Sequence, residues 1–167
     1  NRGNPLVQFA IHRLDTWLSG TPFYKTVHHL IREGYSIDYI SDRFLEKINV
    51  ENGIIKLPGG NYRSIIVPAA QHMPLKTLKK LVALRTMGAS VVFLGAPQSV
   101  PGFFEYQKRE QVLKAYADEK INKVYSLKEM EIPLKKAGVI KEKLVKKGLK
   151  FIRREHSGEK IYYLVNH

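Results

Sequence analysis

The chain has 167 residues, which suffices for one packed domain with a small appendage, and its 44% hydrophobic content is typical of a globular protein. No run of about 18 apolar residues occurs, which excludes a transmembrane helix of ordinary length. The sequence has no cysteine, which excludes disulfides, thiolate metal sites and cysteine nucleophiles.

The formal net charge is +13, and the excess lies mainly toward the C-terminus, where residues 108–167 hold 16 Lys or Arg against 8 Asp or Glu. Most of these residues are lysines along amphipathic stretches, as on a solvated helix face. Nucleic-acid binding is the competing interpretation of such a charge. The start, NRGNPLVQFAIHRL, lacks the pattern of a signal peptide and has no initial methionine, so we expect the chain to be a fragment of a longer protein.

Residues 1–21 show the least regular pattern and are interpreted as a linking segment. Thr21 and Pro22 form a good helix start, with the hydroxyl as N-cap and proline in the first turn, and predict a helix over residues 23–33 that stops at Gly34. Residues 36–40 alternate and predict a strand.

A short helix follows through residue 48, capped by Ser41 or Asp42. The pairs Asn52-Gly53 and Gly59-Gly60 predict turns around a brief strand, residues 54–57.

The next stretch predicts a strand–helix–strand unit. Apolar runs at 65–68 and 90–95 flank an amphipathic segment at 75–87, and Gly88 occupies the position of a helix C-cap. Such crossovers build parallel sheets, so the fold class is α/β with a mostly parallel sheet. The runs 65–67 and 91–93 are expected to be neighbours at its centre, because continuous apolar strands are covered on both faces.

The C-terminal part predicts a helix over 106–119, a strand over 123–126 and a second helix over 127–137. Residues 149–167 predict a β-hairpin turning at 156–158, with Phe151, Tyr163 and Val165 on one apolar face. The expected domain boundaries therefore lie at 1–21, 22–148 and 149–167.

Parallel sheets bind ligands beyond the carboxyl ends of their strands. Residues at those ends are Ser41, Asp42 and Arg43; Pro68, Ala69, Gln71 and His72; and Gly95, Ala96, Pro97 and Gln98. From these we take Asp42, Arg43, His72 and Gln98 as candidate binding residues.

Several chemistries fit the sequence poorly. Prolines in the strand-end loops remove amides that a phosphate site needs. Ala96 and Pro97 stand where a nucleophile elbow needs its nucleophile, and Ser99 lies too far along the loop.

Acid and base chemistry also lacks a candidate pair. Asp38 and Asp42 need not converge as glycosidic acid and base, because one is expected in a strand and the other at a helix cap. The adjacent His28 and His29 point about 100° apart on a helix, which is poor metal geometry. We therefore predict no catalytic residue, no metal site and no cofactor in this chain.

The C-terminal segment KEMEIPLKKAGVIKEKLVKKG, followed by the basic hairpin FIRREHSGEKIYYLV, supports one alternative. It has the order of a winged helix, in which Lys143, Lys146, Lys147, Arg153 and Arg154 would contact DNA phosphates.

Three stretches of the chain are similar to the later part of bacterial glycoside hydrolases, the α-L-rhamnosidases of family 106. They are GYSIDYISDRFL, YRSIIVPAAQHMPLKTLKKL and GASVVFLGAPQSVPGF, and the ending FIRR…IYYLVN resembles the point where those enzymes enter a β-sandwich. The resemblance implies a flavodoxin-like three-layer domain, similar to glutamine amidotransferase-like and β-galactosidase trimerisation domains. It also implies an upstream catalytic (β/α)-barrel with carboxylate acid and base residues and often calcium.

We therefore expect a non-catalytic accessory domain of a rhamnosidase-like enzyme that acts on plant or other complex polysaccharides. Its expected partners are the parent enzyme's barrel and β-sandwich, and carbohydrate through the parent; nucleic acid and membrane are not expected, and a homodimer is a further option. The resemblance implies a periplasmic or extracellular location. The alternative is a basic nucleic-acid-binding protein that uses the winged-helix-like tail.

Overall fold

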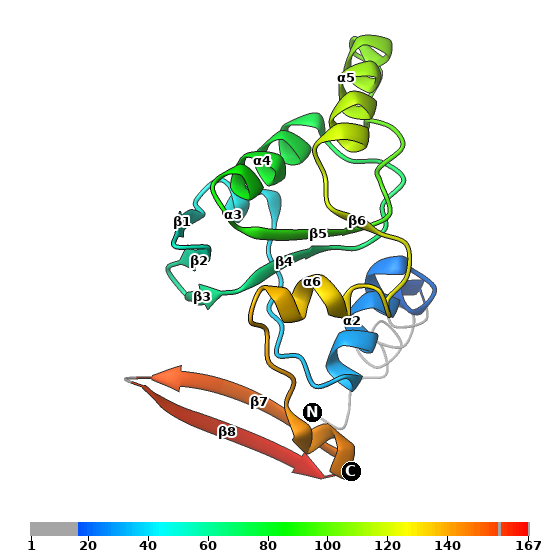
Figure 1. Ribbon diagram of the computed structural model, residues 1–167. Helices are drawn as coiled ribbons and strands as arrows, with labels where there is room; N and C mark the ends of the chain where they lie inside the picture. Colours follow the sequence, from blue (N-terminus) through cyan, green and yellow to red (C-terminus); the bar gives the residue numbers. More distant parts are fainter. Residues whose placement is uncertain (1–16, 157, 167) are drawn as a thin grey trace, which may run out of the picture. The chain divides into compact units, whose positions relative to one another are not determined.

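A computed structural model describes residues 17–156 and 158–166 (Figure 1). The chain divides into two compact units, the first formed by residues 1–37 and 143–167 and the second by residues 38–142.

The first unit contains the helix α2 (Pro22–Arg32), close to the predicted 23–33. The Thr21 hydroxyl accepts a hydrogen bond from the Tyr24 amide at 3.2 Å, as an N-cap residue does. The chain leaves the helix through Gly34 at φ 88°, a conformation that favours glycine. The predicted start and end of this helix are confirmed.

The same unit contains a C-terminal antiparallel hairpin, as predicted. The 3₁₀ helix η1 (Lys143–Lys147) precedes β7 (Leu149–His156), which pairs with β8 (Glu159–Asn166).

The predicted apolar face of this hairpin is wrong in one respect. Phe151 lies opposite Leu164, whereas Tyr163 lies opposite Ile152, so Phe151 and Tyr163 are on different faces. On the other face, Ile152, Ile161 and Tyr163 are exposed, while Val165 is half-buried.

The predicted strand over residues 36–40, which runs from the end of the first unit into the second, is wrong. These residues alternate like a strand but have no regular structure. No described strand pairs with them, and alternation alone does not hold an extended segment in a sheet. Asp38 instead accepts a hydrogen bond from the Tyr62 hydroxyl at 2.9 Å.

The helix α3 (Asp42–Leu45) follows directly, with Ser41 at its N-cap position. A three-stranded antiparallel sheet then consists of β1 (Asn49–Glu51), β2 (Ile54–Leu57) and β3 (Gly60–Tyr62). Asn52 and Gly53 both have positive φ, so the predicted Asn-Gly turn joins the first two strands.

The predicted strand–helix–strand unit is confirmed as β4 (Ser64–Val67), α4 (Leu75–Thr86) and β5 (Ser90–Leu94). β5 also pairs in parallel with β6 (Lys123–Val124), so the parallel sheet has the order β4-β5-β6. The predicted neighbours do pair, with Ile65 opposite Val91, but β5 alone is central and β4 lies at an edge of the described sheet.

Helices cover both faces of this sheet. Both α4 and α6 (Glu131–Lys136) contact β5, and Figure 1 shows them on opposite sides of it. The helix α5 (Tyr106–Glu119) packs against α4, and its Leu113 is fully buried in the same core as Leu78 and Phe93. The mixed α/β class with a parallel sheet is therefore confirmed.

Candidate functional site at the carboxyl edge of the parallel sheet

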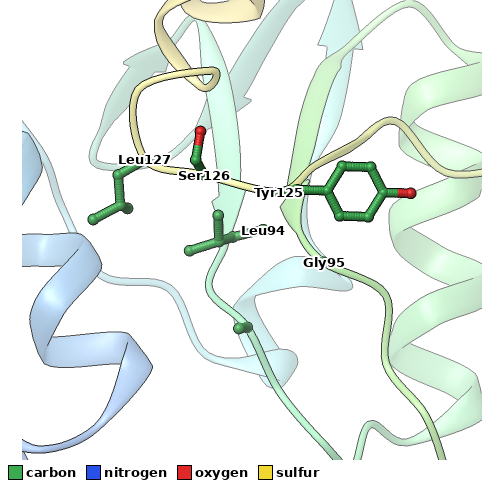
Figure 2. Close-up of a pocket in the computed structure, with 6 residues that line it drawn as sticks. Leu94, Gly95, Tyr125, Ser126 and Leu127 are labelled. Carbon is green, nitrogen blue, oxygen red and sulfur yellow. The ribbon is translucent and has the colours of Figure 1, made fainter.

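A hollow of about 440 Å³ lies beyond the carboxyl ends of the three parallel strands. Its lining comes from the residues that directly follow or end β4, β5 and β6, namely Ala69, Leu94, Gly95, Tyr125, Ser126 and Leu127. Figure 2 shows the side chains of Leu94 and Leu127 on the same side, with the Tyr125 ring extending away from Leu127. The hollow is thus apolar and holds no carboxylate.

A compact turn holds one wall of this hollow. The Glu129 carboxylate accepts hydrogen bonds from the Tyr125 amide at 3.0 Å and from the Ser126 hydroxyl at 2.9 Å, and Ser126 in turn accepts from the Glu129 amide at 3.2 Å. The Tyr125 amide, followed by the Ser126 hydroxyl, holds the pKa of Glu129 below its ordinary value. The negative charge of Glu129 therefore stabilises the turn at residues 125–129.

The loops that follow β4 and β5 are joined beyond the sheet. The amides of Gln98 and Ser99 donate to the Gln71 carbonyl at 3.0 and 3.1 Å, and Met73 donates back to the Ser99 carbonyl at 3.0 Å. His72 and Ser99 form a parallel bridge, and His72 Nδ1 is hydrogen-bonded to Ser99 Oγ. These contacts extend the β4–β5 pairing into the loops.

The predicted candidates separate into two groups. His72 and Gln98 come together in the joined loops, as strand-end reasoning predicts, and both are exposed. Asp42 and Arg43 lie in α3, in the short helix predicted there, but the strand expected before them is absent, so they do not stand at a strand end.

Ser99 has a different role from the nucleophile that the sequence analysis considered. It is 8% exposed, and its hydroxyl is hydrogen-bonded to His72 Nδ1. Tyr106 Oη donates to Glu110 Oε1 at 2.6 Å, and Lys114 Nζ lies 3.3 Å from Glu110 Oε2.

The charges of this group are set by the same contacts. The hydrogen bond with Glu110 raises the pKa of Tyr106, and the hydrogen bond from Tyr106 lowers the pKa of Glu110, which Lys114 lowers further. At neutral pH the phenol is therefore protonated and the carboxylate ionised. The spacing Tyr106–Glu110–Lys114 along one helix face was the available sequence signal for this group.

Arg109 holds the end of the β5 loop. Its guanidinium donates to the carbonyls of Phe104 at 2.7 Å, Pro101 at 3.0 Å and Gly102 at 2.8 Å. The loop held in this way presents Phe103 and Phe104 to solvent, 98% and 81% exposed. Arg109 carries no signal in the sequence, since its partners are backbone carbonyls that no residue pattern marks.

The structure does not supply the recognition helix of the winged-helix alternative. Between residues 127 and 148 the described helices are the six-residue α6 and the five-residue 3₁₀ helix η1. A helix that reads DNA lies in the major groove along several turns.

Over 17–156 and 158–166, no cluster of three His, Asp or Glu side chains is arranged to hold a metal ion. None of the helices in that part of the chain is long and apolar enough to cross a membrane.

The fold defines an α/β domain with a parallel sheet, and open parallel sheets ordinarily bind ligands at the carboxyl ends of their strands. The family model described as alpha-L-rhamnosidase, glycoside hydrolase family 106, matches residues 14–167. The chain therefore belongs to this glycoside hydrolase family, and the predicted resemblance is confirmed. No curated protein and no solved structure matches the chain.

Proposed function

We propose that this chain is a non-catalytic accessory region of an α-L-rhamnosidase-like glycoside hydrolase that acts on plant or other complex polysaccharides. The observation that carries the proposal is the chemistry of the carboxyl edge. The strand-end loops, residues 68–74, 95–104 and 125–127, contain amides, hydroxyls, one imidazole and aromatic rings, but no Asp or Glu. Glycoside hydrolysis ordinarily needs two carboxyl groups, about 5–9.5 Å apart, on either side of the scissile bond.

Three acidic residues of the second unit are engaged in structural contacts. Glu129 holds its own turn, Glu110 is bound by Tyr106 and Lys114, and Asp38 is bound by Tyr62. Each carboxylate is thus held by local donors, as a structural acid is.

The remaining expectations belong to the same proposal. In the whole protein the chain would pack beside a catalytic barrel and continue into a β-sandwich, and a homodimer is a further arrangement. The family points to an extracellular or periplasmic enzyme. Nucleic-acid binding through the basic tail is not proposed, because the described tail lacks a recognition helix.

The test is incubation of the purified chain with aryl α-L-rhamnosides, beside an active α-L-rhamnosidase as positive control. We expect only background release of the aryl group. Asp38→Asn and Asp42→Asn variants serve as comparison, since these carboxylates formed the pair considered from the sequence. Turnover in the wild-type chain that either variant abolishes would contradict the accessory role.

A further inference from the structure

Three cations meet where the C-terminal ends of α4 and α5 pack together in the second unit. The ammonium groups of Lys79 and Lys120 lie 5.8 Å and 4.7 Å from the centroid of the Tyr116 ring, so one aromatic ring holds both of them. The Arg85 guanidinium donates to the Lys120 carbonyl at 2.7 Å, which fixes it at the same place. We call Lys79, Arg85 and Lys120 the cationic corner, and all three are exposed.

The cationic corner lies at the amino edge of the parallel sheet. The helix α4 ends just before β5 begins at Ser90, and α5 ends just before β6 begins at Lys123. The hollow described above lies at the carboxyl ends of the same strands. The two features are therefore at opposite ends of the sheet, and a ligand of the corner would occupy a second site.

Within the part of the chain that the structure describes, no acidic side chain lies within salt-bridge distance of the cationic corner. Elsewhere on α4, Lys76 is paired with Glu46 at 3.0 Å. Of the two acids nearest to Lys120 in sequence, Asp118 is paired with Lys123 at 3.7 Å and Glu119 is in none of the described ion pairs. The charge of the corner is thus not neutralised by the residues around it.

A bound anion would relieve the repulsion among these cations. The Debye length is roughly 10 Å at about 0.1 M salt, and two ammonium groups on one ring are separated by about this length or less, so salt screens them only in part. Because Tyr116 and the Lys120 carbonyl already hold the cations, less side-chain entropy is lost on binding. Arg85 keeps further N–H donors, and a guanidinium matches the paired oxygens of a carboxylate or sulfate.

The charge of the chain and its family together select the class of ligand. A net charge of +13 favours association with polyanions, and the family is one of glycoside hydrolases. We propose that the cationic corner binds an acidic polysaccharide through carboxylate or sulfate groups on its sugars. This inference rests on the proposed function, which makes a polysaccharide the ligand of the whole enzyme, and gives the accessory region a binding site of its own.

The test is isothermal titration calorimetry of the purified chain with polygalacturonate, which carries carboxylates, with dextran sulfate, and with uncharged dextran. At about 50 mM salt we expect binding of an acidic glycan and none of dextran, and the affinity should fall steeply toward about 200 mM salt. The double variant Lys79→Gln and Lys120→Gln should weaken binding about 3- to 10-fold. Whichever acidic glycan binds identifies the anionic group.

A matched control removes the same two charges from the other side of the sheet. Lys135→Gln and Lys136→Gln change exposed lysines on α6 and should leave the affinity within about 2-fold of wild type. Equal weakening by the two double variants would overturn the site, as would no binding of either acidic glycan or tighter binding of duplex DNA at the same salt. Each of these results leaves the accessory role intact, whereas aryl rhamnoside turnover would overturn that role without affecting binding at the corner.

Discussion

Placing one charge at Val92 tests the central position of β5. Val92 is 0% exposed, and its side chain points to the opposite face of the sheet from Val91 and Phe93. Since α4 and α6 cover opposite faces of β5, Val92 faces the α6 layer rather than the α4 core that holds its two neighbours.

The expected loss for Val92→Asp is large. Burial of the valine contributes about 1.5–3 kcal/mol, and an unpaired buried carboxylate costs several kcal/mol more. Domains of this size have a free energy of unfolding of about 5–15 kcal/mol, so the substitution should unfold most of the protein. Val92→Ala, which leaves only a small cavity, should cost about 1–3 kcal/mol.

Urea unfolding followed by far-ultraviolet circular dichroism measures these differences. Ile132→Asp is the matched control, because it introduces the same charge on α6 at a side chain that is 73% exposed, and it should change stability by less than about 0.5 kcal/mol. If Val92→Asp unfolded cooperatively at the same urea midpoint as Ile132→Asp, the assignment of β5 to the sheet centre would be refuted.

Three further substitutions test other features. Arg109→Ala should speed amide hydrogen exchange in residues 101–104. Arg109→Lys should not restore protection, because an ammonium cannot reach three carbonyls as a guanidinium does. Unchanged exchange in Arg109→Ala would contradict the role of Arg109 in holding the loop. Gly88→Ala should cost about 1–2 kcal/mol because φ is +95°, while Gly20→Ala, with open space and no such φ, should be nearly neutral in the same urea assay. Glu129→Gln should lower the thermal midpoint at pH 7. The difference from wild type should shrink as the pH falls below 4.5, the ordinary pKa of a glutamate, because the lowered pKa of Glu129 in the folded state stabilises the protein only while this carboxyl group is ionised. A difference that does not change with pH would contradict a stabilising role of the Glu129 charge.

The sequence predicted the local elements well where local chemistry decides them. Thr21 caps α2, Gly88 ends α4 and the Asn52-Gly53 turn closes its hairpin, because each depends on backbone geometry that few residues allow. The strand predicted at residues 36–40 failed because a strand exists only beside a partner, and pairing is a property of the whole fold.

The same distinction applies to the candidate site. His72 and Gln98 lie on joined loops because β4 and β5 were predicted correctly, whereas Asp42 and Arg43 lie in the predicted short helix but follow no strand. Tyr106 and Glu110 were not identified, although their spacing of four residues along α5 was a signal in the sequence.

The division of the chain also has a consequence for how it folds as it is made. The second unit is one continuous segment, residues 38–142, whereas the first combines residues 1–37 with residues 143–167. A ribosome adds about 5–20 residues per second, so the continuous unit is complete seconds before the last part of the first unit is synthesised. The second unit can therefore fold while translation continues, and the hairpin β7–β8 is left to form last.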